Sequence, residues 1–384
     1  MTDSRIAAES LETLRTRHSA KWRRYPEDVI PLHVAEMDYP VAEPIRQFLG
    51  NLVATSDMGY LGPLPELAPA FVAFAKKRWG WTPDTTAAKL APDVGVATVE
   101  FLRAHNVSRV IVTSPVYVGF WHWLEELGIE IVDVPLTADF RLDVAGIERE
   151  FARGVGHFLL CSPHNPLGRV FTREELTALA EAADRHGAVV ISDEIHAPLT
   201  YPGTEFVPYL SVGEAAERTG VLVTSSSKSW NLAGLKAAFI LGHGARGAEL
   251  LKPLPEAMHW RSSLLGAFSM VVAYRDGAPW LDATMETLEV ARDHLATELA
   301  RLLPGARLEM LPEAGYLAWV DISGLKLGDR PWVKILDQGR VSVVPGTDLG
   351  PQYTQHIRIN FATSPEILTE ALTRIAALQP LRPR

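Results

Sequence analysis

Cysteine is almost absent from this chain, because Cys161 is the only one among 384 residues. No disulfide can form within the chain, and a reducing compartment is expected. Basic residues are outnumbered, with 37 Lys and Arg against 46 Asp and Glu and a net charge of -9, which argues against a surface for nucleic acid or anionic lipid. The start of the chain lacks a basic segment followed by an apolar one, and no uncharged run is long enough to span a bilayer. We expect a cytoplasmic protein with no nucleic-acid partner and no membrane partner.

Internal repeats and low-complexity tracts are absent too, so the organisation has to be read from hydrophobic periodicity. The chain is 47% hydrophobic, enough for a large core, and short β-rich runs alternate with helical patterns through its middle. Continuous apolar strands between helices indicate a mainly parallel sheet covered on both faces. The expected strands are 109–114, 129–134, 157–162, 188–192, 221–225 and 236–242.

A change of pattern near Trp280 suggests a second domain, because a long amphipathic helix begins there and shorter strands follow. We expect a large α/β domain over residues 45–279 and a smaller α/β domain over residues 280–384. Residues 1–44 are expected to form an arm that packs with the small domain. Within the large domain, Thr172 and Glu175 have the capping-box spacing, which predicts a helix that begins after Thr172.

Polar side chains follow three of the expected strands, in the order Asn165, Asp193 and Lys228. In open α/β sheets ligands bind beyond the carboxyl ends of the strands. Each residue by itself is most often a turn residue, a helix cap or a surface lysine. Together with the serines before Lys228 they meet the needs of pyridoxal 5'-phosphate (PLP): a lysine for the Schiff base, a carboxylate for the pyridine nitrogen, and donors for the ring hydroxyl and the phosphate. The sequence therefore predicts a PLP site, without a metal.

Two further stretches fit such a site. Gly95, Val96 and Ala97 lie at an expected helix start, where free backbone N–H groups favour a phosphate. Tyr117 follows an expected strand, so its ring could stack on the cofactor. An ordinary helix start explains Gly95 equally well when it is taken alone.

The motifs resemble those of fold-type I PLP enzymes of the class I/II aminotransferase family, and within it the PatB-type cystathionine beta-lyases, also called C-S lyases. The most specific segments are "SDEIH" and "KSWNLAGL", since ordinary aminotransferases of this fold usually have a tyrosine where His196 stands. The resemblance implies a large domain with a mainly parallel seven-stranded sheet. The matching segments are 21–40, 114–120, 162–176, 192–199, 225–236, 343–350 and 356–364.

The resemblance also implies roles for the residues around the cofactor ring. Lys228 would form the Schiff base and then act as the base that removes the substrate's α proton. Asp193 would pair with the pyridinium nitrogen. Asn165 would donate to the ring hydroxyl and contribute to substrate binding, with His196 nearby.

Further roles concern the phosphate, the substrate and a second subunit. The phosphate would be held by Ser225, Ser227, Lys236, Gly95, Val96 and Ala97. Tyr60 would reach the phosphate of a neighbouring subunit, which predicts a homodimer with shared active sites. Arg358 would clamp the substrate carboxylate, for which guanidinium geometry is well suited.

Ordinary explanations remain open for some of these residues. Arg358 could be a solvent-facing arginine on an edge strand, His196 a core histidine and Tyr60 a packing aromatic. The chain also departs from the family pattern, with Pro198 where relatives often have an acidic residue and lysine instead of arginine at position 236. Neither departure removes a group that the chemistry requires.

The reaction is expected to be β-elimination from L-cystathionine or a related L-cysteine S-conjugate, giving pyruvate, ammonia and a thiol. This preference rests on the resemblance, because no motif reports which bond is held for cleavage. An aminotransferase is the alternative. A non-catalytic PLP-binding regulator is a third possibility, disfavoured because Lys228, Asp193 and Arg358 are all present.

Overall fold

The computed structural model describes residues 5–379, which form two compact units. Unit 1 contains the described residues up to Pro40, the short stretch Asn165–Gly168 and the described residues from Asp282 onward. Unit 2 contains Val41–His164 and Arg169–Leu281. The predicted division into an arm and two domains stays a prediction, and the two chain ends that it includes lie outside the described residues.

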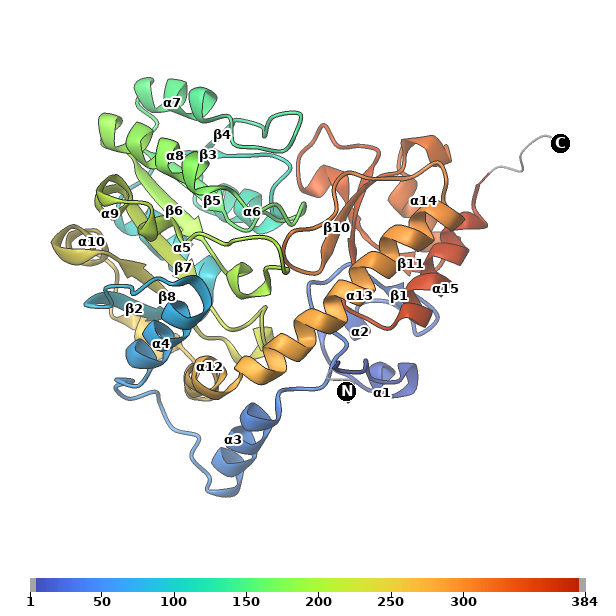
Figure 1. Ribbon diagram of the computed structural model, residues 1–384, viewed down its shortest axis with the longest axis horizontal. Helices are drawn as coiled ribbons and strands as arrows, with labels where there is room; N and C mark the ends of the chain where they lie inside the picture. Colours follow the sequence, from blue (N-terminus) through green and yellow to red (C-terminus); the bar gives the residue numbers. More distant parts are fainter. Residues whose placement is uncertain (1–4, 380–384) are drawn as a thin grey trace. The chain divides into compact units, whose positions relative to one another are not determined.

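Unit 2 is built on a seven-stranded sheet with the strand order β2-β8-β7-β6-β5-β3-β4 (Figure 1). Strands β3 to β7 pair in parallel, whereas β8 runs antiparallel to both of its neighbours. The predicted mainly parallel seven-stranded sheet is therefore confirmed. Its strands are β2 (Ala87–Ala91), β3 (Arg109–Val112), β4 (Glu130–Asp133), β5 (His157–Cys161), β6 (Val189–Asp193), β7 (Gly220–Thr224) and β8 (Ala238–Gly242).

Burial and residue type explain which strands could be predicted from the sequence. Strands β6, β7 and β8 are buried at every position, so both of their faces are apolar and they read as continuous runs. Strand β2 was not expected, because it consists mostly of alanine and lacks the β-branched or aromatic residues that the other strands of this sheet contain.

Helices surround this sheet, and one of them has the predicted capping box. Helix α8 begins after Thr172, whose hydroxyl accepts from the backbone N–H of Glu175, while the Glu175 carboxylate accepts from the Thr172 N–H at 2.8 Å. The helices of unit 2 are α3 (Glu43–Ala54), α4 (Leu67–Trp79), α5 (Val94–Ala104), α6 (Val118–Glu126), α7 (Val144–Ala152), α8 (Arg173–His186), α9 (Glu214–Thr219), α10 (Gly244–Leu251), α11 (Ala257–Arg261) and α12 (Leu264–Asp276).

Unit 1 contains a four-stranded antiparallel sheet with the order β12-β13-β10-β9 and a parallel pair, β1 with β11. The strands are β1 (Ile30–Pro31), β9 (Arg307–Leu308), β10 (Leu317–Asp321), β11 (Val341–Ser342), β12 (Val344–Pro345) and β13 (His356–Asn360). The helices are α1 (Leu11–Arg15), α2 (Ala20–Arg23), α14 (Pro331–Asp337), α15 (Pro365–Ala376) and most of α13 (Ala278–Leu302), whose residues up to Leu281 belong to unit 2. Among residues 5–379, no helix combines the length and apolarity needed to cross a membrane.

Candidate active site

Asp193 and Lys228 lie at or just after the carboxyl ends of two neighbouring strands of unit 2. Asp193 is the last residue of β6 and stands opposite Val223 of β7, and Lys228 follows β7 by four residues. Burial raises the pKa of the Asp193 carboxyl to about 7, opposed by a hydrogen bond from the Ile195 N–H at 3.1 Å and by the charge of Lys228. The parallel register thus places the predicted carboxylate and the predicted amine within electrostatic reach of each other.

The turn that carries Lys228 is anchored on both sides. The Trp230 N–H donates to Ser226 O at 3.0 Å and the Leu232 N–H donates to Ser227 O at 2.8 Å. The indole of Trp230 is fully buried, and its N–H donates to Gly277 O at 3.0 Å. Lys228 itself is half-buried on this hydrogen-bonded turn.

The residues predicted for the phosphate are linked by a chain of short contacts. The Ser225 hydroxyl donates to Ala237 O at 2.6 Å and accepts from the Ser227 N–H at 3.0 Å. Lys236, next to Ala237, has a positive φ of 56°, and its ammonium pairs with Asp93 at 3.0 Å. These bonds connect the serine turn, Lys236 and the start of α5.

Asp93 is a residue of this group that sequence analysis missed. Its Oδ1 accepts from the Val96 N–H at 2.8 Å, which makes it the N-cap of α5, and its Oδ2 pairs with Lys236. An aspartate directly before an expected helix start is the usual N-cap signal and could have revealed it. In this structure Asp93 accepts from two donors that the resemblance assigns to the phosphate.

Tyr117 and Gly95 both lie against the indole of Trp123. The Tyr117 ring packs edge-on against Trp123 with centroids 5.8 Å apart. A Cβ on Gly95 would lie 2.7 Å from the same indole, and one on Gly119 would lie 2.4 Å from the Tyr117 ring. A larger side chain at either position would have to displace one of these rings, so both glycines permit the close packing.

Two buried groups follow Asp193 in the loop after β6. His196 is buried, which is compatible both with a place beside the cofactor and with a core histidine. Glu194 was not predicted; burial raises its pKa to about 8, and its Oε1 accepts from the Ser192 hydroxyl at 2.9 Å and the Tyr209 N–H at 2.8 Å. The "SDE" sequence shows two adjacent carboxyls, but only the structure shows that both are buried.

Tyr60 is 87% exposed, so the alternative that it packs inside its own chain is wrong. It lies between α3 and α4, close in sequence to Met58, which is also exposed. Its predicted contact with a neighbouring subunit stays a prediction.

Arg358 and Asn165 belong to unit 1, where they contact each other. Arg358 lies on β13, between β12 and β10, and is only 4% exposed. Its Nη1 donates to Asn165 Oδ1 at 3.2 Å and its Nη2 donates to His33 O at 2.9 Å. The alternative of a solvent-facing arginine on an edge strand is therefore wrong, because β13 is an interior strand.

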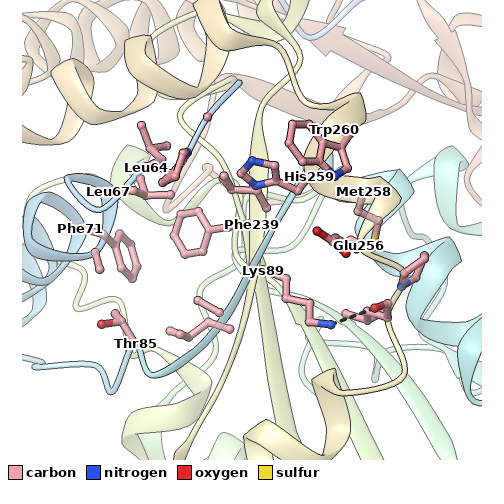
Figure 2. A pocket seen from close by; sticks show the side chains of 18 residues that line it. Leu64, Leu67, Phe71, Thr85, Lys89, Phe239, Glu256, Met258, His259 and Trp260 are labelled. Carbon is pink, nitrogen blue, oxygen red and sulfur yellow. Dashed lines mark hydrogen bonds between the residues drawn. The ribbon is translucent and has the colours of Figure 1, made fainter. Parts of the chain in front are cut away.

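A separate pocket of about 560 Å³ lies in unit 2 between α4, β2 and α11. Figure 2 shows apolar side chains such as Leu64 and Phe239 lining it, together with Lys89, which donates to Leu254 O at 2.9 Å. None of the predicted site residues lines this pocket. It adjoins the segment after Tyr60, since Gly62 is one of its lining residues.

Known proteins resemble this chain over nearly its whole length. The model of the family "Aminotransferase class I and II" matches residues 93–375. A cystathionine beta-lyase from Corynebacterium glutamicum is 34% identical over 96% of this chain and 98% of its own, and a Mycobacterium leprae protein provisionally named a cystathionine beta-lyase is 38% identical over 98% of both chains. The structure of a PLP-bound C-S lyase from Staphylococcus hominis superposes with a TM-score of 0.87 at 25% identity, covering 95% of this chain and 96% of its own. This chain therefore belongs to the class I and II aminotransferase family, and within it to the group of the cystathionine beta-lyases.

Proposed function

We propose that the protein is a PLP-dependent carbon-sulfur β-lyase that cleaves L-cystathionine or a related L-cysteine S-conjugate to pyruvate, ammonia and a thiol. The observation that carries the proposal is nearly full-length similarity to the cystathionine beta-lyase of C. glutamicum. The chain keeps the lysine, the buried carboxyl and the buried arginine that this chemistry needs, at Lys228, Asp193 and Arg358.

The residues of unit 2 fit PLP. Asp193 is a buried carboxyl whose pKa is raised to about 7, and a cation beside it would lower that pKa and keep the carboxylate ionised. Ser225, Ser227, Lys236 and the first turn of α5 would hold the phosphate, with Asp93 exchanging its two hydrogen bonds for others. When bound, the cofactor supplies an electron sink for charge that develops at the substrate's α carbon.

The chain's own groups would hold the substrate and move its proton. Arg358, supported by Asn165, would bind the α-carboxylate and so orient the bond from the α carbon to its hydrogen. The Lys228 amine would accept the α proton, because it is the amine on the turn after β7, within electrostatic reach of Asp193. Asp193 would remain ionised throughout and stabilise positive charge next to it.

The reaction is tested by product analysis. L-cystathionine and S-ethyl-L-cysteine are expected to yield pyruvate catalytically with no keto acid added, because elimination consumes no acceptor. Pyruvate would be followed by coupling to lactate dehydrogenase, and the free thiol by a colorimetric reagent. Turnover that requires a keto acid across the whole panel would contradict the lyase and support an aminotransferase.

We further propose a homodimer that covers the surface around Tyr60. Large apolar side chains are exposed there and near the pocket of Figure 2, with Tyr60 87%, Met58 51% and Trp260 54% exposed. Exposed apolar surface of this kind is typical of an interface. Tyr60 would then contribute to the phosphate site of the second subunit.

Mixed dimers test this sharing. Tyr60→Ala and Lys228→Ala chains are each expected to be impaired, and after dissociation and mixing they should regain up to about a quarter of the wild-type activity, because a mixed dimer holds one complete site. The matched control mixes Tyr60→Ala chains with chains that carry both substitutions, and it should show no recovery. Absence of recovery in dimers shown to be mixed would exclude a shared site.

A cytoplasmic location is also part of the proposal. Its support is the single cysteine, Cys161, which is buried. Proteins of oxidising compartments more often rely on disulfides.

A further inference from the structure

Four consecutive backbone carbonyls of unit 1, from His33 to Glu36, each accept a hydrogen bond from a side chain. We call these residues the 33–36 segment. The donors lie on β13, on α2 and, for Tyr316, directly before β10. The bonds are Arg358 Nη2 to His33 O at 2.9 Å, Asn360 Nδ2 to Val34 O at 2.6 Å, Tyr316 Oη to Ala35 O at 3.0 Å, Asn360 Nδ2 to Glu36 O at 2.6 Å and Lys21 Nζ to Glu36 O at 3.2 Å.

Asn360 makes the central contacts of this arrangement. Its amide nitrogen donates to two of the four carbonyls, and its Oδ1 accepts from the Ala362 N–H at 2.8 Å. Its backbone N–H also donates to Leu32 O at 2.9 Å. Asn360 is completely buried, so water cannot replace a bond that is lost.

The same segment contacts Arg358. Arg358 and Asn360 are two residues apart on β13, so their side chains emerge on the same face of the sheet. The guanidinium is held by His33 O, which accepts from its Nη2, and by Asn165 Oδ1, which accepts from its Nη1. Asn360 holds the carbonyls of Val34 and Glu36, which follow His33 in the same segment, and through them the position of His33 O.

We propose that Asn360 is a positioning residue for substrate binding, which holds the 33–36 segment so that Arg358 presents its guanidinium to the carboxylate of the amino-acid substrate. This rests on the proposed function of Arg358. Tyr316 assists through Ala35, and its ring is fully buried. A bidentate carboxylate contact demands a defined guanidinium plane, which explains why buried hydrogen bonds hold the segment that contacts Arg358.

The test compares isosteric substitutions in the PLP-loaded protein. Asn360→Asp keeps the acceptor for the Ala362 N–H but removes both donations to the segment. Its affinity for 3-(ethylthio)propionate, a carboxylate that cannot react, is expected to fall at least about tenfold by calorimetry. The KM for S-ethyl-L-cysteine should rise by a similar factor with kcat largely retained, because the proton-transfer groups are unchanged.

Thr363→Val is the matched control. Thr363 lies three residues beyond Asn360 and is 2% exposed, and its hydroxyl has no hydrogen-bond partner among residues 5–379. This variant should bind the carboxylate as the wild type does. If Asn360→Asp does not fold, Tyr316→Phe removes the bond to Ala35 O and should still weaken binding by about two- to tenfold.

A double-mutant cycle separates positioning from general structural support. If Asn360 acts through Arg358, Asn360→Asp should weaken carboxylate binding in the wild type but add little in the Arg358→Leu background. Fully additive losses, or unchanged binding in both Asn360→Asp and Tyr316→Phe, would overturn the inference. If no S-conjugate yields pyruvate but the carboxylate cycle behaves as expected, the proposed reaction fails and the role of Asn360 stands.

Discussion

Replacing Lys228 by alanine is expected to lower the turnover of S-ethyl-L-cysteine by at least about a thousandfold, because one amine provides both the covalent attachment and the proton transfer. The turn after β7 offers no second amine at this position, and Lys236 would be engaged by the phosphate. Lys228→Ala should still retain PLP through contacts to the phosphate. Steady-state pyruvate release measures the loss.

Covalent labelling identifies the lysine without an activity assay. Borohydride reduction of the yellow holoprotein should attach the cofactor to the peptide that contains Lys228, as seen by mass spectrometry. Lys77→Ala, on the exposed surface of α4, is the matched control and should remain active and label at Lys228. Attachment to another lysine would refute the assignment.

Replacing Arg358 by leucine is expected to lower kcat/KM by about 30- to 5000-fold, which corresponds to about 2–5 kcal/mol for the loss of one partner of a buried charge pair. The substrate carboxylate would then be buried without its counter-charge. Most of the loss should be in KM if the arginine holds the carboxylate equally in the ground state and the transition state.

Arg358→Lys separates charge from geometry. It keeps the positive charge but loses the planar fork, so its kcat/KM should fall between those of the wild type and Arg358→Leu. Both variants leave Asn165 Oδ1 and His33 O without the guanidinium, so melting temperatures must accompany the kinetics. If a folded Arg358→Leu protein has the kcat/KM of the wild type, Arg358 does not bind the substrate carboxylate.

Local patterns predicted the elements of the large sheet well. Strands β5 to β8 lie within two residues of their expected ranges, because burial on both faces leaves a continuous apolar run. The capping box at Thr172 is present because it involves contacts only three residues apart. Such features depend on neighbours in the sequence and can be read from it.

Residues whose role depends on distant neighbours were harder to place. The alternation around Arg358 left solvent and interior equally possible, because either face of a strand can be buried. Asp93 could be recognised only as an N-cap. Its contact with Lys236 could not be predicted, because the two residues are 143 positions apart in the sequence. The role of Asn360 could not be predicted, because the sequence does not indicate which distant carbonyls its side chain contacts.

The sequence by itself determined the fold class, because the apolar runs of a parallel sheet are visible in it. It also determined the kind of cofactor, because Asn165, Asp193 and Lys228 follow successive strands and are the residue types that PLP requires. The tertiary structure decided the rest. It placed Arg358 and Asn165 together in unit 1, buried both Asp193 and Glu194, exposed Tyr60, and surrounded the 33–36 segment with donors from β13, from α2 and from Tyr316 before β10. Burial and long-range hydrogen bonds depend on which segments meet in space, and no short stretch of sequence contains that information.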